Sequence, residues 1–291
     1  MSATKTIAEE LGFAKDAKLL IINADDSGLC HSANMATLRA LEMGAVTTTT
    51  AMPPCPWFPE MAILAADNPD LDVGLHLTVN CEWKRYRWAP VAGPKAVPSL
   101  VGADGFFWPT EDETVANGTV EDVRTEMRAQ IERALTLGLK PTHIDNHMGP
   151  IHYRRDFFEA MVEIGHEYGL PSRVPFYHDV AEAHDMPCIQ SFGMYYAPEG
   201  GKKEKFELYE AHVRGLEPGV HEIAVHLADD TEEWRELCFV ANDDHPWEDR
   251  LLDYQYVTAP ETASLFREVG VELIGYRALQ TLWKKRLGSA R

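Results

Sequence analysis

Short apolar runs rich in β-branched residues alternate along the chain with longer stretches of helical periodicity. The runs predict strands over residues 19–26, 46–52, 72–77, 141–147, 172–174, 220–226 and 272–276. Apolar residues spaced three and four apart, with glycine or polar caps at the ends, predict helices over residues 32–42, 59–66, 119–138, 154–168, 247–256 and 261–269. Strands that alternate with helices are typical of a parallel sheet with helices outside it.

This rhythm predicts an α/β fold made of a single (β/α) TIM-like barrel, deformed or incomplete, over residues 19–291. Residues 1–18 form a short helical extension before it. A long aromatic-rich loop over about residues 80–118 interrupts the alternation, and residues 178–200 give no clear prediction. The alternative is an open doubly wound sheet, but ADDSGL follows the first strand where a GxGxxG phosphate loop would be needed.

Composition narrows the classes of partner. The 291 residues include 27 Lys and Arg against 46 Asp and Glu, a net charge of −19, which disfavours binding to nucleic acid or to an anionic membrane. The five cysteines are scattered and never form CxxC, as expected of reduced thiols. Glu9 and Glu10 stand where a secretory signal peptide would need an unbroken apolar region. No apolar run in the chain is close to the length needed to span a membrane. We therefore expect a cytoplasmic protein, and a homodimer is compatible with the sequence.

The first predicted strand ends in adjacent carboxylates, Asp25 and Asp26. Two neighbouring carboxylates repel each other, so burying both requires a cation or strong hydrogen bonds. A divalent metal is one such cation. The alternative, of equal weight from this stretch alone, is that both aspartates cap the following helix.

Histidines and carboxylates also lie at the ends of later predicted strands. Together with the aspartate pair they form the set Asp25, Asp26, His76, His143, Asp145, His147 and His226. In a parallel barrel the carboxyl ends of the strands meet at one mouth, where active sites are built. Mixed oxygen and imidazole ligands suit zinc, manganese, iron or cobalt. Seven of the other eight histidines, His152 among them, are interpreted as structural.

Six short blocks carry a resemblance to a known family. In order along the chain these blocks are NADDSGL, GAVTTTTAM, VGLHLTV, PTHIDNHMG, PGVHEIAVH and VELIGYRAL, with Asn34 in the helix after the first. They resemble the YdjC-like carbohydrate deacetylases, also called the ChbG/HpnK family, over residues 19–280. The resemblance implies a deformed barrel and metal-dependent removal of an acetyl group from an N-acetylated sugar.

The same resemblance implies roles for individual residues. Asp26, His76 and His147 are similar to the family's metal ligands, Asp25 to its general base, and His226 to the histidine that faces the leaving group. The cofactor we expect is one divalent metal ion, zinc in the first place, with magnesium, manganese or cobalt as alternatives. The partner we expect is a small acetylated sugar.

Three positions depart from the family pattern. Ser27 replaces the usual Phe, Met148 and Gly149 replace further histidines, and Leu227 replaces Pro. None of these changes removes an expected metal ligand, but each alters a wall of the site, so the identity of the sugar stays open.

Further candidates for substrate binding are aromatic and basic. Trp83 and Trp88 of the long loop could form a platform for a pyranose ring, or could simply fasten the loop to the barrel. Arg173 could orient Asp25 or hold an oxyanion, although a surface ion pair is the simpler interpretation. Two other functions remain open: a metal-dependent barrel enzyme such as a sugar isomerase or phosphoesterase, and a non-catalytic sugar-binding relative.

Overall fold

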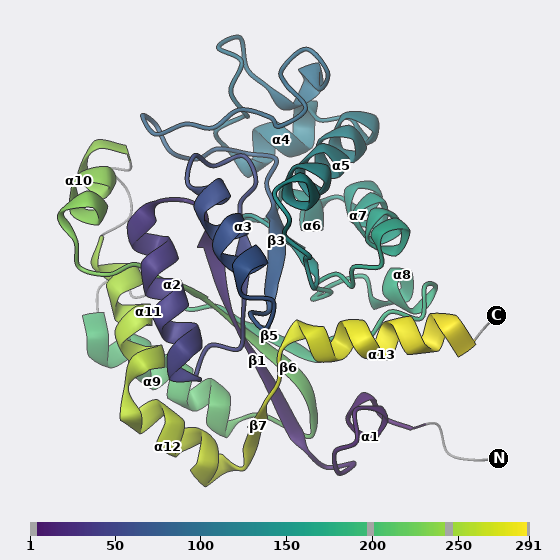
Figure 1. The fold of residues 1–291 in the computed structure, drawn as a ribbon, viewed down its shortest axis with the longest axis vertical. Helices are drawn as coiled ribbons and strands as arrows, with labels where there is room; N and C mark the ends of the chain where they lie inside the picture. Colours follow the sequence, from purple (N-terminus) through teal and green to yellow (C-terminus); the bar gives the residue numbers. More distant parts are fainter. Residues whose placement is uncertain (1–4, 197–200, 242–246, 290–291) are drawn as a thin grey trace.

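The fold is built on one parallel sheet, seen in a computed structural model that describes residues 5–196, 201–241 and 247–289 (Figure 1). The strands of this part of the chain are β1 (Lys18–Ser27), β2 (Thr48–Ala51), β3 (Val73–Leu77), β4 (Ile144–Asn146), β5 (Ser191–Gly193), β6 (Gly219–His226) and β7 (Val271–Leu273). Every pairing between them is parallel.

The strand order confirms an incomplete barrel. Six strands follow the order β4-β3-β2-β1-β6-β5, and β7 pairs with the first part of β1. This order is cyclic, because β6 returns to pair with β1 and the gap lies between β4 and β5. A doubly wound sheet would instead reverse its strand order at a switch point. The strand expected over 172–174 is reduced to a single bridge between Ser172 and Ile144 at the edge of that gap.

Helices surround the sheet on its outer side (Figure 1). They are α1 (Ile7–Glu10), α2 (His31–Met43), α3 (Phe58–Asp67), α4 (Glu111–Asn117), α5 (Val120–Thr136), α6 (Pro150–Tyr153), α7 (Arg155–Tyr168), α8 (His178–Glu182), α9 (Gly201–Arg214), α10 (Glu232–Ala241), α11 (Glu248–Thr258), α12 (Pro260–Val269) and α13 (Tyr276–Ser289), with a 3₁₀ turn at Pro98–Leu100. No helix in the described ranges is both long and apolar enough to cross a membrane.

Helix ends follow local chemistry, with two corrections to the sequence prediction. The Sγ of Cys30 caps α2 by accepting the amide of Ala33, whereas Ser32, the expected cap, donates instead to the carbonyl of Asp229. The last strand ends at Leu273 and not at Tyr276, because Tyr276 begins α13 and buried Asp72 accepts the amide of Arg277 in its first turn. The sequence also did not predict helices α4, α6, α8, α9, α10 and α13, and α4 lies within the stretch expected to be a loop.

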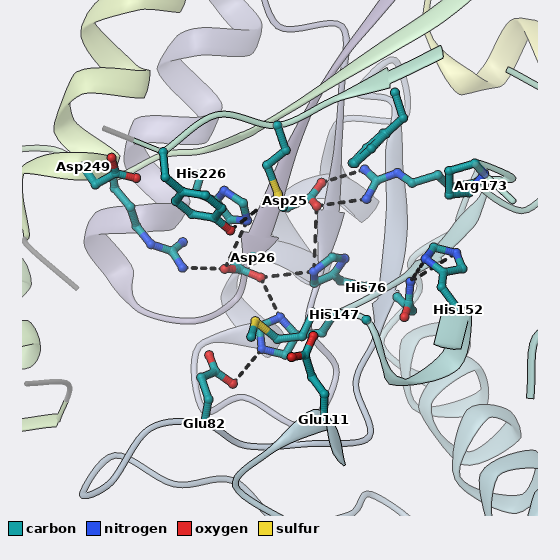
Figure 2. Close-up of a pocket in the computed structure, with 18 of the residues that line it drawn as sticks. Asp25, Asp26, His76, Glu82, Glu111, His147, His152, Arg173, His226 and Asp249 are labelled. Carbon is teal, nitrogen blue, oxygen red and sulfur yellow. Dashed lines mark hydrogen bonds and ion pairs between the residues drawn. The ribbon is translucent and has the colours of Figure 1, made fainter. Parts of the chain in front are cut away.

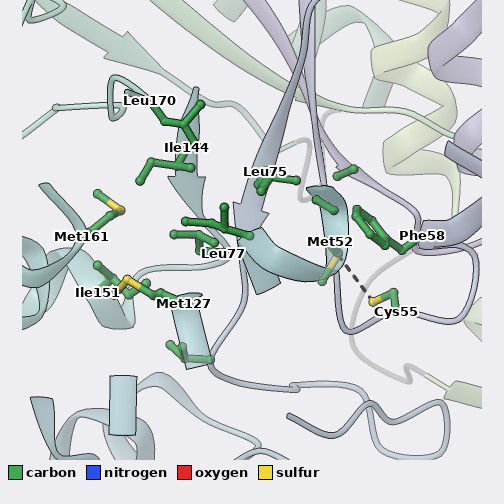
Figure 3. Close-up of a cluster of buried hydrophobic side chains, with 14 of the residues drawn as sticks. Met52, Cys55, Phe58, Leu75, Leu77, Met127, Ile144, Ile151, Met161 and Leu170 are labelled. Carbon is green, nitrogen blue, oxygen red and sulfur yellow. Dashed lines mark hydrogen bonds between the residues drawn. The ribbon is translucent and has the colours of Figure 1, made fainter. Parts of the chain in front are cut away.

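The main core lies between the sheet and helices α3, α5 and α7, where buried side chains of β3 and β4 meet those of the helices (Figure 3). Met52, Leu75, Leu77, Ile144 and Met161 belong to this cluster and are fully buried. Strands β2 to β4 are buried along their whole length, as strands covered on both faces should be. This packing fixes the carboxyl ends of the strands, where the polar residues lie.

Candidate active site

A cavity of about 440 Å³ opens at the carboxyl ends of the strands. Seven of the eight residues expected from the sequence to act in catalysis or binding line it: Asp25, Asp26, His76, Trp83, His147, Arg173 and His226. Figure 2 shows Asp26 near the centre, with His76 and His147 on one side and His226 on the other. Only Trp88 of the expected set lies outside the lining.

A bulge in β1 explains how neighbouring aspartates share one cavity. Ala24 pairs with Thr49 and Ser27 with Ala51, so two residues of β1 lie opposite the single residue Thr50. Asp26 takes a left-handed backbone conformation, with φ of 65°. In a regular strand adjacent side chains point to opposite faces. The extra residue re-aims Asp26, so that both carboxylates reach the cavity.

Asp26, His76 and His147 bring three potential ligand atoms together. The Oδ1 atom of Asp26 lies 3.2 Å from Nε2 of His76 and 3.1 Å from Nδ1 of His147. All three side chains are buried, and their ligand atoms lie within 4.8 Å of one another. One carboxylate oxygen and two imidazole nitrogens form a donor set that zinc and related divalent metals bind. These residues therefore fit a metal.

Each of the two imidazoles is oriented by a carboxylate on its other nitrogen. Nδ1 of His76 lies 2.6 Å from Oδ1 of Asp145, and Nε2 of His147 lies 2.9 Å from Oε2 of Glu82. Such second carboxylates are the usual companions of metal-binding histidines. Burial lowers the pKa of both histidines, but nearby carboxylates outweigh burial. Asp145 and Asp25 raise the pKa of His76 to about 10. Glu82 and Asp26 raise the pKa of His147 to about 9. The same negative charges favour binding of a cation.

Arg173 binds the carboxylate of Asp25 in a bidentate manner. Its NH1 donates to Oδ2 of Asp25 at 2.9 Å and its NH2 to Oδ1 at 2.7 Å. The arginine is buried, and it also contacts Asp145 and Glu222. Burial raises the pKa of Asp25, but Arg173 and then His76 outweigh burial and lower that pKa below its usual value. The expectation of a surface ion pair for Arg173 is therefore wrong.

His226 stands at the end of β6, paired in register with Asp25. Its backbone amide donates to Oδ2 of Asp253 at 2.9 Å, and its Nε2 lies 4.0 Å from Oδ2 of Asp26. The ring of Tyr196 stacks over it, with centroids 6.1 Å apart. Burial lowers the pKa of His226 to about 4, against the attraction of Asp26. The imidazole is thus neutral at neutral pH.

The aromatic residues of the long loop divide between two places. Trp83 lines the cavity, whereas Trp88 is buried behind it, with its Nε1 donating to the carbonyl of Asn80 and its ring against that of His147. The expected platform role is therefore wrong for Trp88, which fastens the loop. Tyr86 and Trp108 also lie outside the cavity lining, and their polar atoms donate to the backbone carbonyls of Leu29 and Ser99.

Two histidines lie where the sequence did not indicate. His143 was grouped with the strand-end residues, but it is buried outside the cavity lining and stacks on Tyr276 with centroids 3.8 Å apart. His152 was interpreted as structural, yet it lines the cavity and contacts the amide of Asn146 at 2.9 Å. The strand pattern did not predict which of these side chains reach the cavity, because β4 spans only Ile144–Asn146 and both histidines lie outside it.

The departures from the family pattern affect the cavity unequally. Ser27 is buried and its hydroxyl pairs with that of Thr49, away from the lining. Met148 lines the cavity with φ of 56° and 45% of its surface exposed, and Gly149 follows against the ring of Tyr153. The change at Met148 and Gly149 therefore alters the cavity wall, whereas the change at Ser27 does not.

Sequence reasoning did not identify several cavity residues that come from helices and loops: Glu82, Glu111, Tyr196, Trp234 and Arg250. Arg250, near the start of α11, donates to Oδ2 of Asp26. Glu82 and Tyr196 lie in the loops beyond β3 and β5, and the other three belong to helices, so the pattern of polar residues at strand ends did not include them.

Comparison with known proteins gives consistent results. The family model described as YdjC-like protein matches residues 19–268. A carbohydrate deacetylase of Geobacillus stearothermophilus is 30% identical over 272 residues, covering 90% of this chain and 98% of that protein. A chitooligosaccharide deacetylase of Yersinia enterocolitica is 32% identical over 162 residues, covering 54% of this chain and 59% of that protein.

A solved structure agrees with the fold. A protein of Enterococcus faecalis V583, provisionally named a cellobiose-phosphate cleavage protein, superposes with a TM-score of 0.75 at 27% identity, covering 90% of this chain and 99% of that one. The family match spans nearly the whole barrel and every expected metal ligand. This chain belongs to the YdjC-like protein family.

Proposed function

We propose that this protein is a metal-dependent hydrolase that removes the acetyl group from an N-acetylated sugar. The observation that carries the proposal is the buried cluster of Asp26, His76 and His147 beside an aspartate, Asp25, that Arg173 keeps ionised. The names of the curated relatives, carbohydrate and chitooligosaccharide deacetylase, support the same reaction class.

In this proposal Oδ1 of Asp26, Nε2 of His76 and Nδ1 of His147 hold one divalent metal ion. We propose zinc, with magnesium, manganese or cobalt as alternatives, from the chemistry of the donors. When bound, such an ion supplies Lewis-acid polarisation of a carbonyl and lowers the pKa of water.

Asp25 serves as general base. Its carboxylate lines the cavity one residue from Asp26, and Arg173 keeps it ionised, which is the form that can accept a proton from the attacking water. The guanidinium fork also fixes the direction of the carboxylate, because both oxygens are held. General-base assistance typically contributes about 10²–10⁴ in rate.

His226 serves as the proton donor to the departing amine. It lies across Asp26 from His76 and His147 (Figure 2), and the bond from its amide to Asp253 fixes the strand end that carries it. Its imidazole is neutral at neutral pH, so it must first gain the proton that Asp25 takes from the attacking water and then pass that proton to the amine. Trp83 forms part of the wall along which the sugar lies.

The test is acetate release from a panel of N-acetylated mono- and oligosaccharides. We expect release by the purified protein, loss of release after chelation, and recovery when a divalent metal is added back. Asp25→Asn should keep the metal and lower turnover by about 10²–10⁴. Its amide can still occupy the place of the carboxylate but cannot accept the proton.

Other outcomes would contradict the proposal. Isomerised sugar or free phosphate without acetate would favour another barrel enzyme. A metal-loaded protein that is inert on every acetylated substrate would favour a sugar-binding role. Loss of metal from Asp25→Asn with activity retained would reverse the roles of Asp25 and Asp26.

A further inference from the structure

Arg250 presents an unpaired donor at the cavity wall. Its NH2 donates to Oδ2 of Asp26, the oxygen turned away from His76 and His147. Its NH1 is buried and has no hydrogen-bond partner, although the side chain lines the cavity. Figure 2 shows Asp249, the preceding residue, on the His226 side of Asp26. The same oxygen of Asp26 lies 4.0 Å from Nε2 of His226, so the guanidinium of Arg250 lies on the His226 side of Asp26.

An unpaired charged donor in such a place calls for an explanation. Buried polar groups are nearly always satisfied, and a buried donor without a partner costs about 1–3 kcal/mol, more when it is charged. The other cavity-lining arginine of the described residues, Arg173, donates from each of its three nitrogens. Among the described cavity-lining residues, orphaned side-chain atoms occur only on Arg250 and on the neutral amide of Asn146. Arg250 is thus the one arginine of the described cavity lining with a nitrogen that has no partner.

The guanidinium is also held in place before any ligand arrives. It lies over the ring of Trp234, 5.3 Å from the centroid, and Nε1 of Trp234 donates at 2.8 Å to the carbonyl of Trp247 just before α11. Donors fixed in advance stabilise developing charge most effectively, because they need not reorganise during the reaction.

We propose that NH1 of Arg250 binds the acetyl carbonyl oxygen of the substrate as that oxygen becomes an oxyanion, and afterwards binds the carboxylate of the acetate product. Water attack moves negative charge onto this oxygen, and a charge-assisted hydrogen bond strengthens as the charge grows. The proposal rests on the deacetylase function above, and it adds a positive charge supplied by the protein to the charge of the proposed metal ion. Arg250 is then a catalytic residue and not only a support for Asp26.

The test compares Arg250→Lys and Arg250→Met with a matched control. Lysine can keep a positive charge beside Asp26, but it has a single nitrogen in place of the two terminal nitrogens of the guanidinium group. Methionine removes the charge. Arg235→Met is the control, because exposed Arg235 also pairs with an aspartate, Asp230, and also lies over a tryptophan, Trp247. Each variant is measured for metal affinity, for kcat of acetate release at saturating metal, and for acetate binding to the metal-loaded protein.

We expect Arg250→Lys to keep metal affinity close to that of the parent while kcat falls about 10²–10³-fold, the usual effect of losing one oxyanion donor. Acetate binding should weaken in both Arg250 variants and stay unchanged in Arg235→Met. The inference is wrong if both variants bind acetate like the parent. It is equally wrong if excess metal restores full kcat, since Arg250 would then only orient Asp26.

Acetate binding separates this inference from the proposed function. If the parent protein binds acetate through Arg250 but releases none from any sugar, the donor site stands and the deacetylase proposal fails. If the parent releases acetate and the Arg250 variants do so at the same rate, the deacetylase proposal stands and the role of Arg250 falls.

Discussion

At the scale of single residues, environment assigns different chemistry to two adjacent aspartates. Asp25 is held on both oxygens by Arg173, whereas Asp26 faces two imidazoles with one oxygen and Arg250 with the other. Both carboxyls have a lowered pKa despite burial, the first mainly through Arg173 and the second mainly through Arg250. Two identical side chains can therefore serve as base and metal ligand.

A prediction at this scale concerns His226. If it protonates the leaving amine, His226→Ala should slow amide hydrolysis by about 10²–10⁴-fold. Hydrolysis of an activated aryl acetate should fall far less, because that leaving group departs without a proton. Steady-state rates on both substrates give the ratio. Equal losses on amide and ester would contradict the assignment and indicate a role in binding or in placing Asp26.

At the scale of elements, the bulge in β1 and the loop after β3 complete the candidate site, which regular strands alone would leave incomplete. The bulge at Asp25 and Asp26 turns both side chains into the cavity, and the loop after β3 brings Glu82 onto His147. This loop is anchored by helix α5, where the buried carboxylate of Glu126 accepts the amides of Val91 and Ala92 at 2.9 and 3.0 Å. The loop is therefore part of the site's frame.

Glu82→Gln tests the contribution of the loop. Glu82 fixes the ring of His147 so that Nδ1 faces Asp26, and loss of such a second carboxylate typically lowers metal affinity about 10–100-fold. The control is Asp104→Asn, a carboxylate of the same loop that pairs with Arg87 outside the cavity lining. Calorimetric titration of the metal checks both variants. Unchanged affinity in Glu82→Gln would show that the loop does not support the metal.

At the scale of the whole molecule, the site ties together distant parts of the sheet. The three proposed ligands come from β1, from β3 and from the turn after β4, and β3 lies between β2 and β4 in the sheet. The barrel is open between β4 and β5, so hydrogen bonds do not close it there. A bound ion would join β1 to the β4 edge across the mouth.

Metal should therefore stabilise the fold. At free metal about 100 times its Kd the gain is about 2.7 kcal/mol, which for a chain of this size corresponds to a rise in Tm of about 5 °C. Thermal unfolding with and without metal, after chelation, measures the shift. Asp26→Asn should abolish the shift and Asp104→Asn should keep it. A shift that persists in Asp26→Asn would place the stabilising ion elsewhere.

Much of this architecture was accessible from the sequence because local patterns determine it. Apolar, β-branched runs predicted six of the seven strands of the described residues, and glycines such as Gly44 marked helix ends where a left-handed residue is needed. Polar residues at the ends of parallel strands must meet at one edge of the sheet, so the sequence alone groups Asp25, Asp26, His76, His147 and His226.

Tertiary structure decided the rest, because it depends on contacts between segments far apart in the chain. The contacts of Arg173 with Asp25, of Glu82 with His147 and of Arg250 with Asp26 each join residues more than 60 positions apart in the chain. Trp83 and Trp88 look alike in sequence, yet packing sends one to the cavity and the other behind it. Sequence alone thus determined which strands carry the chemistry, and long-range packing determined the surroundings that give each group its charge, direction and role.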